Sequence, residues 1–168
     1  GIPADQIQVL TPTRKGPSGT MNLNRCLQQA LNPKTPDKRE ILWGERLFRE
    51  GDRIMQTRND YDVVWEKEDG TVGTGMFNGD VGKITQIDPS GEWLSVDFDG
   101  RSALYGVEQL AELDLAYAQT VHKAQGSEYR AVVLAAMPAA QSLMVRGVLY
   151  TALTRARELL VVVGDDAA

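Results

Sequence analysis

A polar turn near residue 120 carries the densest group of side chains that could bind an anion. Hydroxyl, imidazole, ammonium and amide groups are followed by a glycine and an acid: Thr120, His122, Lys123, Gln125, Gly126 and Glu128. Glycine lets backbone N–H groups approach an anion closely. The composition of this turn therefore indicates a phosphate-binding loop. The alternative is a polar surface loop between two strands.

The flanking segments predict the elements that position this turn. A strand-like run precedes it at 115–118, and the near-continuous apolar run 131–137 is typical of a central parallel strand. Apolar residues at helical spacing follow over 143–157, and 159–163 indicates another buried strand. Strand, helix and strand in alternation predict a parallel, three-layer α/β sheet.

The N-terminal region shows the same order around a basic loop. Residues 7–11 predict a short buried strand, and the loop TRKGPSGT holds Arg14 and Lys15. A helix is expected to follow, with an apolar face formed by Met21, Leu23, Leu27 and Leu31. The two cations then lie at the end of a strand, where α/β sheets bind ligands. The alternative is a solvated loop without a specific role.

From residue 46 the sequence changes to short runs separated by turn signals. Glycines and β-branched residues over 46–111 predict a small antiparallel barrel of SH3-like size. Asp99-Gly100 is a strong hairpin signal. The aromatics of this segment could form a base-stacking surface, but Trp93 and Phe98 are expected in the core, because they lie in alternating strands. Tyr61, in a turn, is the better candidate for a surface role.

Charge is unevenly distributed along the chain, whose net charge is −5. Residues 1–58 carry +4, residues 59–112 carry −9 and residues 113–168 are neutral. An acidic middle segment is a poor candidate for a groove that follows phosphates. Any nucleic-acid contact is therefore expected mostly from the first and last thirds.

Composition is that of a globular protein without a membrane segment. Of the 168 residues, 42% are apolar and 24% charged, and the apolar runs are far too short to span a bilayer. No signal peptide is visible at the start. The single cysteine, Cys26, excludes an internal disulfide and a cysteine cluster for metal. A cytoplasmic location is expected.

Three stretches together resemble the motifs of one protein family. Residues 120–129 read TVHKAQGSEY, residues 150–157 read YTALTRAR, and residues 9–33 read VLTPTRKGPSGTMNLNRCLQQALNP. In this order they resemble motifs V, VI and IV of superfamily 1 helicases, in the RecD-like, 5′→3′ branch (superfamily 1B). The resemblance covers nearly the whole chain.

The resemblance implies an α/β fold in three segments. A RecA-like domain of the P-loop NTPase type (domain 2A), with a parallel sheet, is expected to be interrupted by a small all-β SH3-like barrel (domain 2B). The halves of domain 2A are expected at 1–45 and 112–168, and the insertion at 46–111. In this family the barrel contributes to binding single-stranded DNA, which makes Tyr61 a candidate contact.

The resemblance also implies contacts to the nucleotide. An arginine at a helix end is by itself a favourable partner of the helix dipole. The family match makes Arg155 the arginine finger, which offsets charge on the γ-phosphate during phosphoryl transfer. Gly126 and Glu128 match positions that face the nucleotide. Arg14 is expected to contact the nucleotide or the DNA backbone, with Lys15 as its alternative. Arg157 is expected in a local ion pair.

A second set of residues is implied in binding single-stranded DNA: Thr120, His122, Lys123, Gln125, Thr11 and Pro12. Thr120 and His122 match positions that face the DNA backbone, although His122 could instead be a structural residue. Lys123 and Gln125 could serve either ligand, and Thr11 and Pro12 could shape a DNA-facing turn. One loop that touches both ligands can transmit cleft closure into strand movement.

The sequence lacks the main nucleotide-binding elements of such a motor. No G-x-x-x-x-G-K-[ST] loop occurs, nor an apolar strand ending in an acidic pair for Mg²⁺. ATP with Mg²⁺ is therefore expected to be held mainly by an N-terminal motor domain of the same protein. The chain alone is expected to hydrolyse no ATP, to hold no metal of its own and to contact no membrane.

Two alternatives stay open. The chain could be a non-catalytic module whose barrel binds a protein or a nucleic acid, with the α/β part as scaffold. It could also belong to a translocase that moves on RNA, because backbone contacts carry little information about the sugar.

Overall fold

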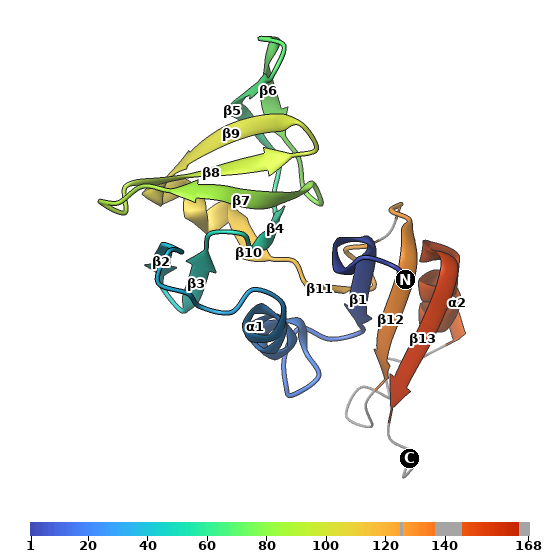
Figure 1. Cartoon of the computed structure of the whole chain (residues 1–168). Helices are drawn as coiled ribbons and strands as arrows, with labels where there is room; N and C mark the ends of the chain where they lie inside the picture. The colour runs from blue at the N-terminus through green and yellow to red at the C-terminus, as the bar shows by residue number, and fades with distance from the viewer. Residues whose placement is uncertain (125, 137–145, 165–168) are drawn as a thin grey trace. The chain divides into compact units, whose positions relative to one another are not determined.

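The computed structural model describes residues 1–124, 126–136 and 146–164, which form two compact units (Figure 1). One unit combines Gly1–Leu31 with Tyr117–Ala168, and the other is the segment between them, Asn32–Ala116. The first unit is therefore discontinuous in sequence, and the second is inserted into it.

The discontinuous unit is built on a parallel sheet. Its described strands are β1 (Ile7–Thr11), β11 (Ala118–Thr120), β12 (Tyr129–Ala136) and β13 (Ala156–Gly164), in the order β11-β1-β12-β13. Every neighbouring pair in this sheet is parallel. β12 lies between β1 and β13, which confirms the central strand predicted after the polar turn.

Two helices pack on this sheet (Figure 1). α1 (Thr20–Leu31) packs against β11, and α2 (Arg146–Arg155) packs against β12 and β13. A short 3-10 helix, η1 (Ala4–Gln6), precedes β1. Strands, turn and helix share one core: Leu10, Val121, Ala124, Val132, Leu134 and Ala152. The predicted α/β architecture is confirmed.

Two predictions of burial in this unit are wrong. Met21 and Leu31 of α1 are 55% and 51% exposed, and the side chains that α1 buries are Asn24 and Gln28. Amide hydrogen bonds fix this helix, and a hydrophobic pattern cannot reveal them. β13 is mostly exposed, because it pairs only with β12 and stands at the edge of the described sheet.

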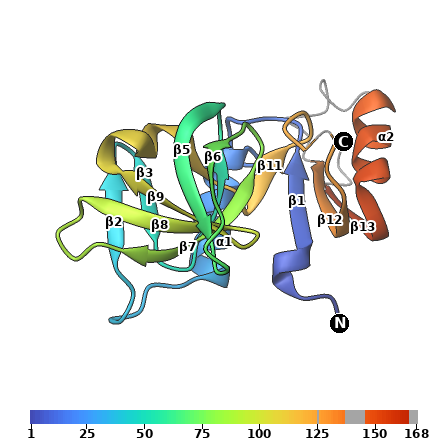
Figure 2. The ribbon, with the colours of Figure 1, turned by 90° about the horizontal axis from the view of Figure 1, so that it is seen from above.

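The inserted unit is a seven-stranded antiparallel sheet with a separate hairpin (Figure 2). In sheet order its strands are β10 (Leu113–Leu115), β4 (Arg53–Gln56), β7 (Val81–Ile87), β8 (Trp93–Phe98), β9 (Arg101–Gly106), β5 (Asp60–Lys67) and β6 (Val72–Met76). The hairpin joins β2 (Glu40–Trp43) to β3 (Arg46–Arg49). The 3-10 helix η2 (Val107–Glu112) leads from β9 to β10.

Side chains from strands across this sheet fill one core, so the sheet curls around it. The core includes Phe48, Ile54, Val63, Met76, Ile84, Val96 and Tyr105. The predicted hairpin is confirmed at Asp99-Gly100, whose φ angles of +52° and +90° suit a type I′ turn. Phe98 is buried as predicted, but Trp93 is only half-buried. An odd separation along β8 places these two rings on opposite faces.

The compact inserted unit reaches beyond residues 46 and 111, the edges expected from composition. β2 precedes the first edge, and β10 follows the second and pairs with β4. A buried polar cluster holds the start of the unit, where the carboxylate of Asp52 accepts hydrogen bonds of 2.7 Å from Asn32 and from the N–H of Arg49. Composition marks the glycine-rich middle but not these long-range pairings.

Candidate functional site

Two loops leave the carboxyl edge of the parallel sheet from neighbouring strands. Thr11 ends β1, Thr120 ends β11, and the two residues pair in register. The N–H of Val121 also donates to the carbonyl of Thr11 at 3.0 Å. The predicted basic loop and the predicted polar turn therefore start side by side, although they lie far apart in the sequence.

The hydroxyl of Thr11 closes the basic loop. It donates to the carbonyl of Ser18 at 2.7 Å, and Thr11 is fully buried. Pro12 follows and is half-buried. Thr11 therefore sets the path of the loop and presents no side chain to a ligand.

The rest of the basic loop presents two cations. Arg14 and Lys15 are exposed, while their carbonyl oxygens lie so close to Gly19 that an added Cβ would come within 2.6 and 2.5 Å of them. The carbonyl of Arg14 accepts from the N–H of Met21, in the first turn of α1, at 3.4 Å. The loop itself thus caps part of the helix end, and its charged side chains face solvent.

The turn after β11 is anchored by two buried side chains and leaves its histidine outside. The hydroxyl of Thr120 accepts from the N–H of Lys123 at 3.1 Å, and the carbonyl of Thr120 accepts from the N–H of Ala124 at 3.2 Å. Val121 and Ala124 are buried in the core, whereas His122 is exposed. His122 therefore does not support the core.

Buried amides that the hydrophobic pattern did not predict hold β11 in place. The side chain of Asn24 donates to the carbonyl of Ala118 at 3.0 Å and accepts from the N–H of the same residue at 2.7 Å. Gln119 donates to Gln8 at 3.3 Å, and Gln8 donates to the carbonyl of Tyr117 at 3.1 Å. A glutamine within the first apolar run was the signal for this network in the sequence.

Arg155 lies at the opposite, amino edge of the sheet. It is the last residue of α2, and Tyr129 pairs with Ala156 directly after it. Its guanidinium donates to the carbonyl of Ser127 at 3.3 Å and to the hydroxyl of Thr154 at 3.2 Å. Its Nε is buried and has no hydrogen-bond partner among the residues described. The end of α2 is thus tied to the segment that precedes β12.

The two predicted neighbours of this contact flank Ser127. Gly126 has a φ of +84°, which favours glycine, and an added Cβ there would meet nothing within 4 Å. Glu128 is exposed. The N–H of Ser127 donates to the carbonyl of Ala124 at 3.1 Å, which leads the chain back to the anchored turn. Gln125 lies outside the described residues.

An ion pair beside Arg155 joins the starts of β12 and β13. Arg130 donates to the two carboxylate oxygens of Glu158 at 2.9 and 3.0 Å, and to Gln6 at 2.9 Å. The hydrogen bond from Arg130 holds the pKa of Glu158 below its ordinary value, and the charge of Arg157 acts in the same direction. This pair fixes the two strand starts that frame the Arg155–Ser127 contact.

The predicted site residues therefore fall into two groups at opposite edges of the sheet. The carboxyl-edge group is Thr11, Pro12, Arg14, Lys15, Thr120, His122 and Lys123. The amino-edge group is Gly126, Glu128 and Arg155. The eight residues of β12 separate the edges by roughly 25 Å. Arg14 and Lys15 are thus brought to Thr120 and not to Arg155, and segment 121–128 runs from one edge to the other.

Tyr61 belongs to the inserted unit and is 67% exposed. Its ring meets that of Phe77 edge to face, with centroids 5.6 Å apart. Phe77 is itself 41% exposed. The two rings form a small aromatic surface, of which only Tyr61 was predicted to have a surface role.

Two protein-family profiles match the chain. One is described as the ATP-dependent RecD-like DNA helicase SH3 domain and matches residues 23–98. The other is the UvrD-like helicase C-terminal domain, at residues 115–163. Over 96% of its length the chain is 40% identical to the ATP-dependent RecD2 DNA helicase of Deinococcus radiodurans. In both profiles and in this relative, the chain is similar to RecD-like DNA helicases.

The RecD-like chain spans only part of its relatives. It covers 20% of the Deinococcus protein, and 26% of the RecBCD enzyme subunit RecD of Mycolicibacterium smegmatis, to which it is 31% identical over 97% of its own length.

Solved structures share its fold. A Bacteroides Pif1 bound to ssDNA superposes with a TM-score of 0.57 at 17% identity, over 93% of this chain and 40% of that one. Pif1 helicase from Candida albicans gives a TM-score of 0.51 at 16% identity, over 94% and 44%. Together with the family profiles, these likenesses confirm a RecA-like parallel-sheet domain interrupted by an SH3-like barrel.

Arg155 and Gly126 both remain accessible at the amino edge of the sheet. Arg155 is half-buried and keeps its guanidinium at the edge of the sheet, and Gly126 leaves the space beside its Cα open.

Within residues 1–124, 126–136 and 146–164, no three His, Cys, Asp or Glu side chains gather as metal ligands. In the same residues, no helix has the length and apolar character required to cross a bilayer.

Proposed function

We propose that this RecD-like chain is the second motor domain of an ATP-dependent 5′→3′ DNA helicase. The observation that carries the proposal is the hydrogen bond from Arg155 to the carbonyl of Ser127, because it joins the two motif regions expected to act on the nucleotide. The 5′→3′ polarity follows from the family. Within this proposal, Asn32–Ala116 is domain 2B and the discontinuous unit is domain 2A.

The amino-edge group would face ATP. Arg155 would act as the arginine finger and offset the charge that develops during transfer of the γ-phosphate, an effect on the order of 10³–10⁵ in rate. The contacts to Ser127 and Thr154 orient its guanidinium before the nucleotide arrives. Gly126 would allow the main chain to approach the nucleotide closely, and Glu128 would lie near its ribose.

The nucleotide and Mg²⁺ would be held mainly by the N-terminal motor domain of the same protein. The sequence contains no G-x-x-x-x-G-K-[ST] loop to bind the phosphates. The chain alone is therefore proposed to be inactive as an ATPase, with Arg155 completing a site whose other residues lie on that partner domain.

The carboxyl-edge group would bind the backbone of single-stranded DNA. Thr120, His122 and Lys123 would contribute from the turn after β11, and Gln125 belongs to the same segment. Since Arg14 and Lys15 lie at this edge, we assign them to the DNA backbone rather than to the nucleotide. Thr11 and Pro12 would shape the turn, and Tyr61 would add a stacking contact from the barrel.

Segment 121–128 would couple ATP turnover to movement along DNA. Val121 and Ala124 anchor it in the core, and the carbonyl of Ser127 ties it to Arg155. A shift of Arg155 when the nucleotide cleft closes would reach the turn of His122 through this short connection. Such a motor would serve DNA repair and recombination in the cytoplasm.

DNA-stimulated ATP hydrolysis by the parent protein tests the proposal. Arg155→Ala is expected to lower turnover by on the order of 10³ or more while affinity for single-stranded DNA is kept. Arg157→Ala, an exposed arginine two positions on, is the matched control and is expected to change turnover only a few-fold. Unchanged turnover in Arg155→Ala would refute the finger, and a parent without DNA-dependent hydrolysis would favour the binding-module alternative. Stimulation by RNA of equal length would favour a translocase on RNA.

A further inference from the structure

The inserted unit turns one face of its sheet away from its core. On the neighbouring strands β8, β9 and β5, alternate residues point outward and form what we call the outer face: Asp62, Val64, Glu66, Ser95, Asp97, Ser102 and Leu104. Their sequence neighbours Val63, Val96 and Ala103 are buried in the core. The proposed motor function uses none of the outer-face residues.

The centre of the outer face is apolar. Val64 and Leu104 are 57% and 61% exposed. The register that pairs Trp65 with Ala103 sets Val64 beside Leu104 on adjacent strands. Val72, opposite Glu66 on β6, is also exposed. Such neighbouring exposed apolar side chains favour an interaction surface over isolated surface residues.

Carboxylates surround this apolar centre. Asp62 and Glu66 flank Val64 along β5, and Asp97 stands two strands away, opposite Ser102. Asp62 and Glu66 are exposed, and neither forms an ion pair within the described part of the chain. The carboxylate of Asp97 accepts from the N–H of Gly100 at 2.9 Å, which leaves its charge in place.

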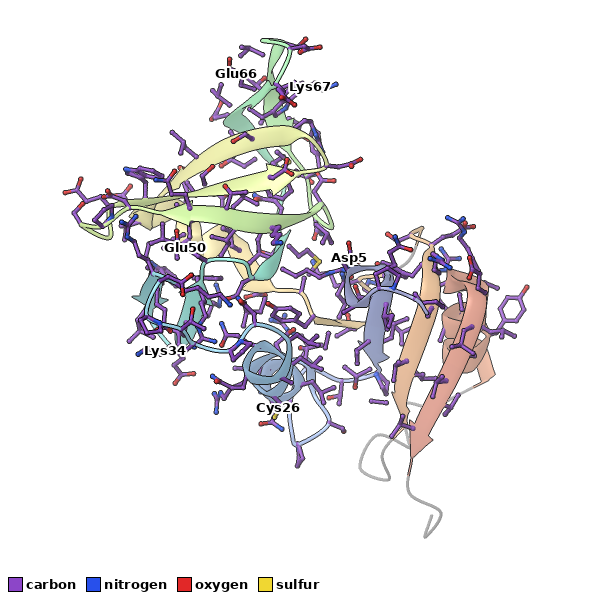
Figure 3. All side chains as sticks on the ribbon, in the orientation of Figure 1. Asp5, Cys26, Lys34, Glu50, Glu66 and Lys67 are labelled. Atoms are coloured by element: carbon purple, nitrogen blue, oxygen red, sulfur yellow. The ribbon has the colours of Figure 1, made fainter. Side chains whose placement is uncertain are left out.

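The nearest cations of β5 and β9 lie over a ring that packs on the core, although Lys67 also borders the groove beside the outer face. Lys67 and Arg101 pair in register, and both lie over the ring of Trp65, at 5.9 and 5.6 Å from its centroid. Glu66 and Lys67 are neighbours near the end of β5 (Figure 3), yet strand alternation sends them to opposite faces. Lys83, paired with Asp97 on β7, is a further cation at the border of the outer face.

A groove of about 870 Å³ runs along the outer face, lined by residues 62–68 and by Asp97, Gly100, Ser102, Leu104 and Gln109. Its lining carries one cation, Lys67, and four carboxylates, so it is acidic on balance. An acidic lining repels a phosphate backbone. A second copy of the same face would bring like charges together. A basic polypeptide with apolar side chains matches both the charge and the apolar centre.

We propose that the outer face of β8, β9 and β5 binds a basic, extended segment of a protein partner. Its lysines or arginines meet Asp62, Glu66 and Asp97, and its apolar side chain covers Val64 and Leu104. This role is independent of the motor function, because it uses neither Tyr61 nor any residue of the two edge groups.

Fluorescence anisotropy with the parent protein tests the surface. The probe is a fluorescein-labelled peptide, Lys-Leu-Lys-Val-Lys-Gly, and the control peptide carries glutamate in place of lysine. Asp62→Lys with Glu66→Lys is expected to lower affinity for the lysine peptide at least about tenfold, since attraction becomes repulsion at two positions. Glu45→Lys with Glu92→Lys makes the same change of charge at two exposed sites on the same unit and is expected to alter affinity less than twofold.

A third variant separates shape from charge. Leu104→Ser keeps every charge and, because Leu104 is exposed, is not expected to affect folding. It should lower the affinity for the lysine peptide several-fold. Equal losses in the two charge-reversal pairs would show attraction by net charge alone and would overturn the proposal. Equal binding of both peptides, or displacement of the lysine peptide from this face by single-stranded DNA, would overturn it as well.

Discussion

The guanidinium of Arg155 donates a 3.3 Å hydrogen bond to the main-chain carbonyl of Ser127, which joins the end of α2 to the segment before β12. Because the acceptor belongs to the main chain, the contact depends on the path of the backbone and not on the serine hydroxyl. That path passes through Gly126, whose φ is +84°. The position of Arg155 is therefore coupled to the conformation of a single glycine.

Gly126→Ala is expected to disturb this contact. Holding alanine at this φ costs roughly 1 kcal/mol, and relaxation of the loop would move the carbonyl of Ser127. We expect a similar loss in the free energy of unfolding by urea, and ATP turnover in the parent protein reduced about tenfold. Ser127→Ala removes only a side chain and should leave both quantities unchanged. An inactive Ser127→Ala beside an active Gly126→Ala would contradict this view.

Asn24→Ala is expected to destabilise the discontinuous unit by about 2–3 kcal/mol. The substitution removes two hydrogen bonds and leaves the N–H and carbonyl of Ala118 without the amide that satisfies them. Asn22→Ala, on the same helix, loses one exposed bond to the carbonyl of Pro17 and should cost less than about 1 kcal/mol. Urea unfolding of both variants measures the difference, and equal losses would rule out the role assigned to Asn24.

Stability is expected to fall with acid partly through Glu158. Its pKa is lowered in the folded state, chiefly by the hydrogen bond from Arg130, so folding favours the ionised carboxylate. The resulting stabilisation is complete above the ordinary pKa of 4.5 and is lost as the pH falls through the lower folded value. In urea unfolding between pH 6 and 3, Glu158→Gln should therefore show a shallower loss of stability. The same slope as the wild type would contradict the effect.

Tyr61→Ala is expected to weaken binding of single-stranded DNA to the parent protein. A stacked base contributes about 1–3 kcal/mol, so affinity should fall at least about fivefold. Tyr150→Ala is the control, because that tyrosine on α2 is exposed to nearly the same extent, 66% against 67%. Fluorescence titration with a labelled oligonucleotide measures both. Equal affinities for the two variants would remove Tyr61 from the DNA-binding set.

Much of the local structure follows from the sequence alone. Periodicity predicted β12 as a parallel strand, and Asp99-Gly100 predicted its hairpin, because both depend on residues close together in the chain. The motif stretches around Thr120 and Arg155 were recognisable for the same reason. The order of elements then fixed the α/β class, with an inserted barrel.

Only the tertiary structure decided how these pieces meet. The pairing of Thr11 with Thr120 and the contact of Arg155 with Ser127 sort the site residues onto two edges of one sheet. The pairing of β10 with β4 sets the extent of the inserted unit, and the amide of Asn24 replaces the apolar helix face that the pattern favoured. These contacts join distant segments, and their register depends on hydrogen bonds formed only when the sheet assembles, so a pattern along the chain cannot determine them.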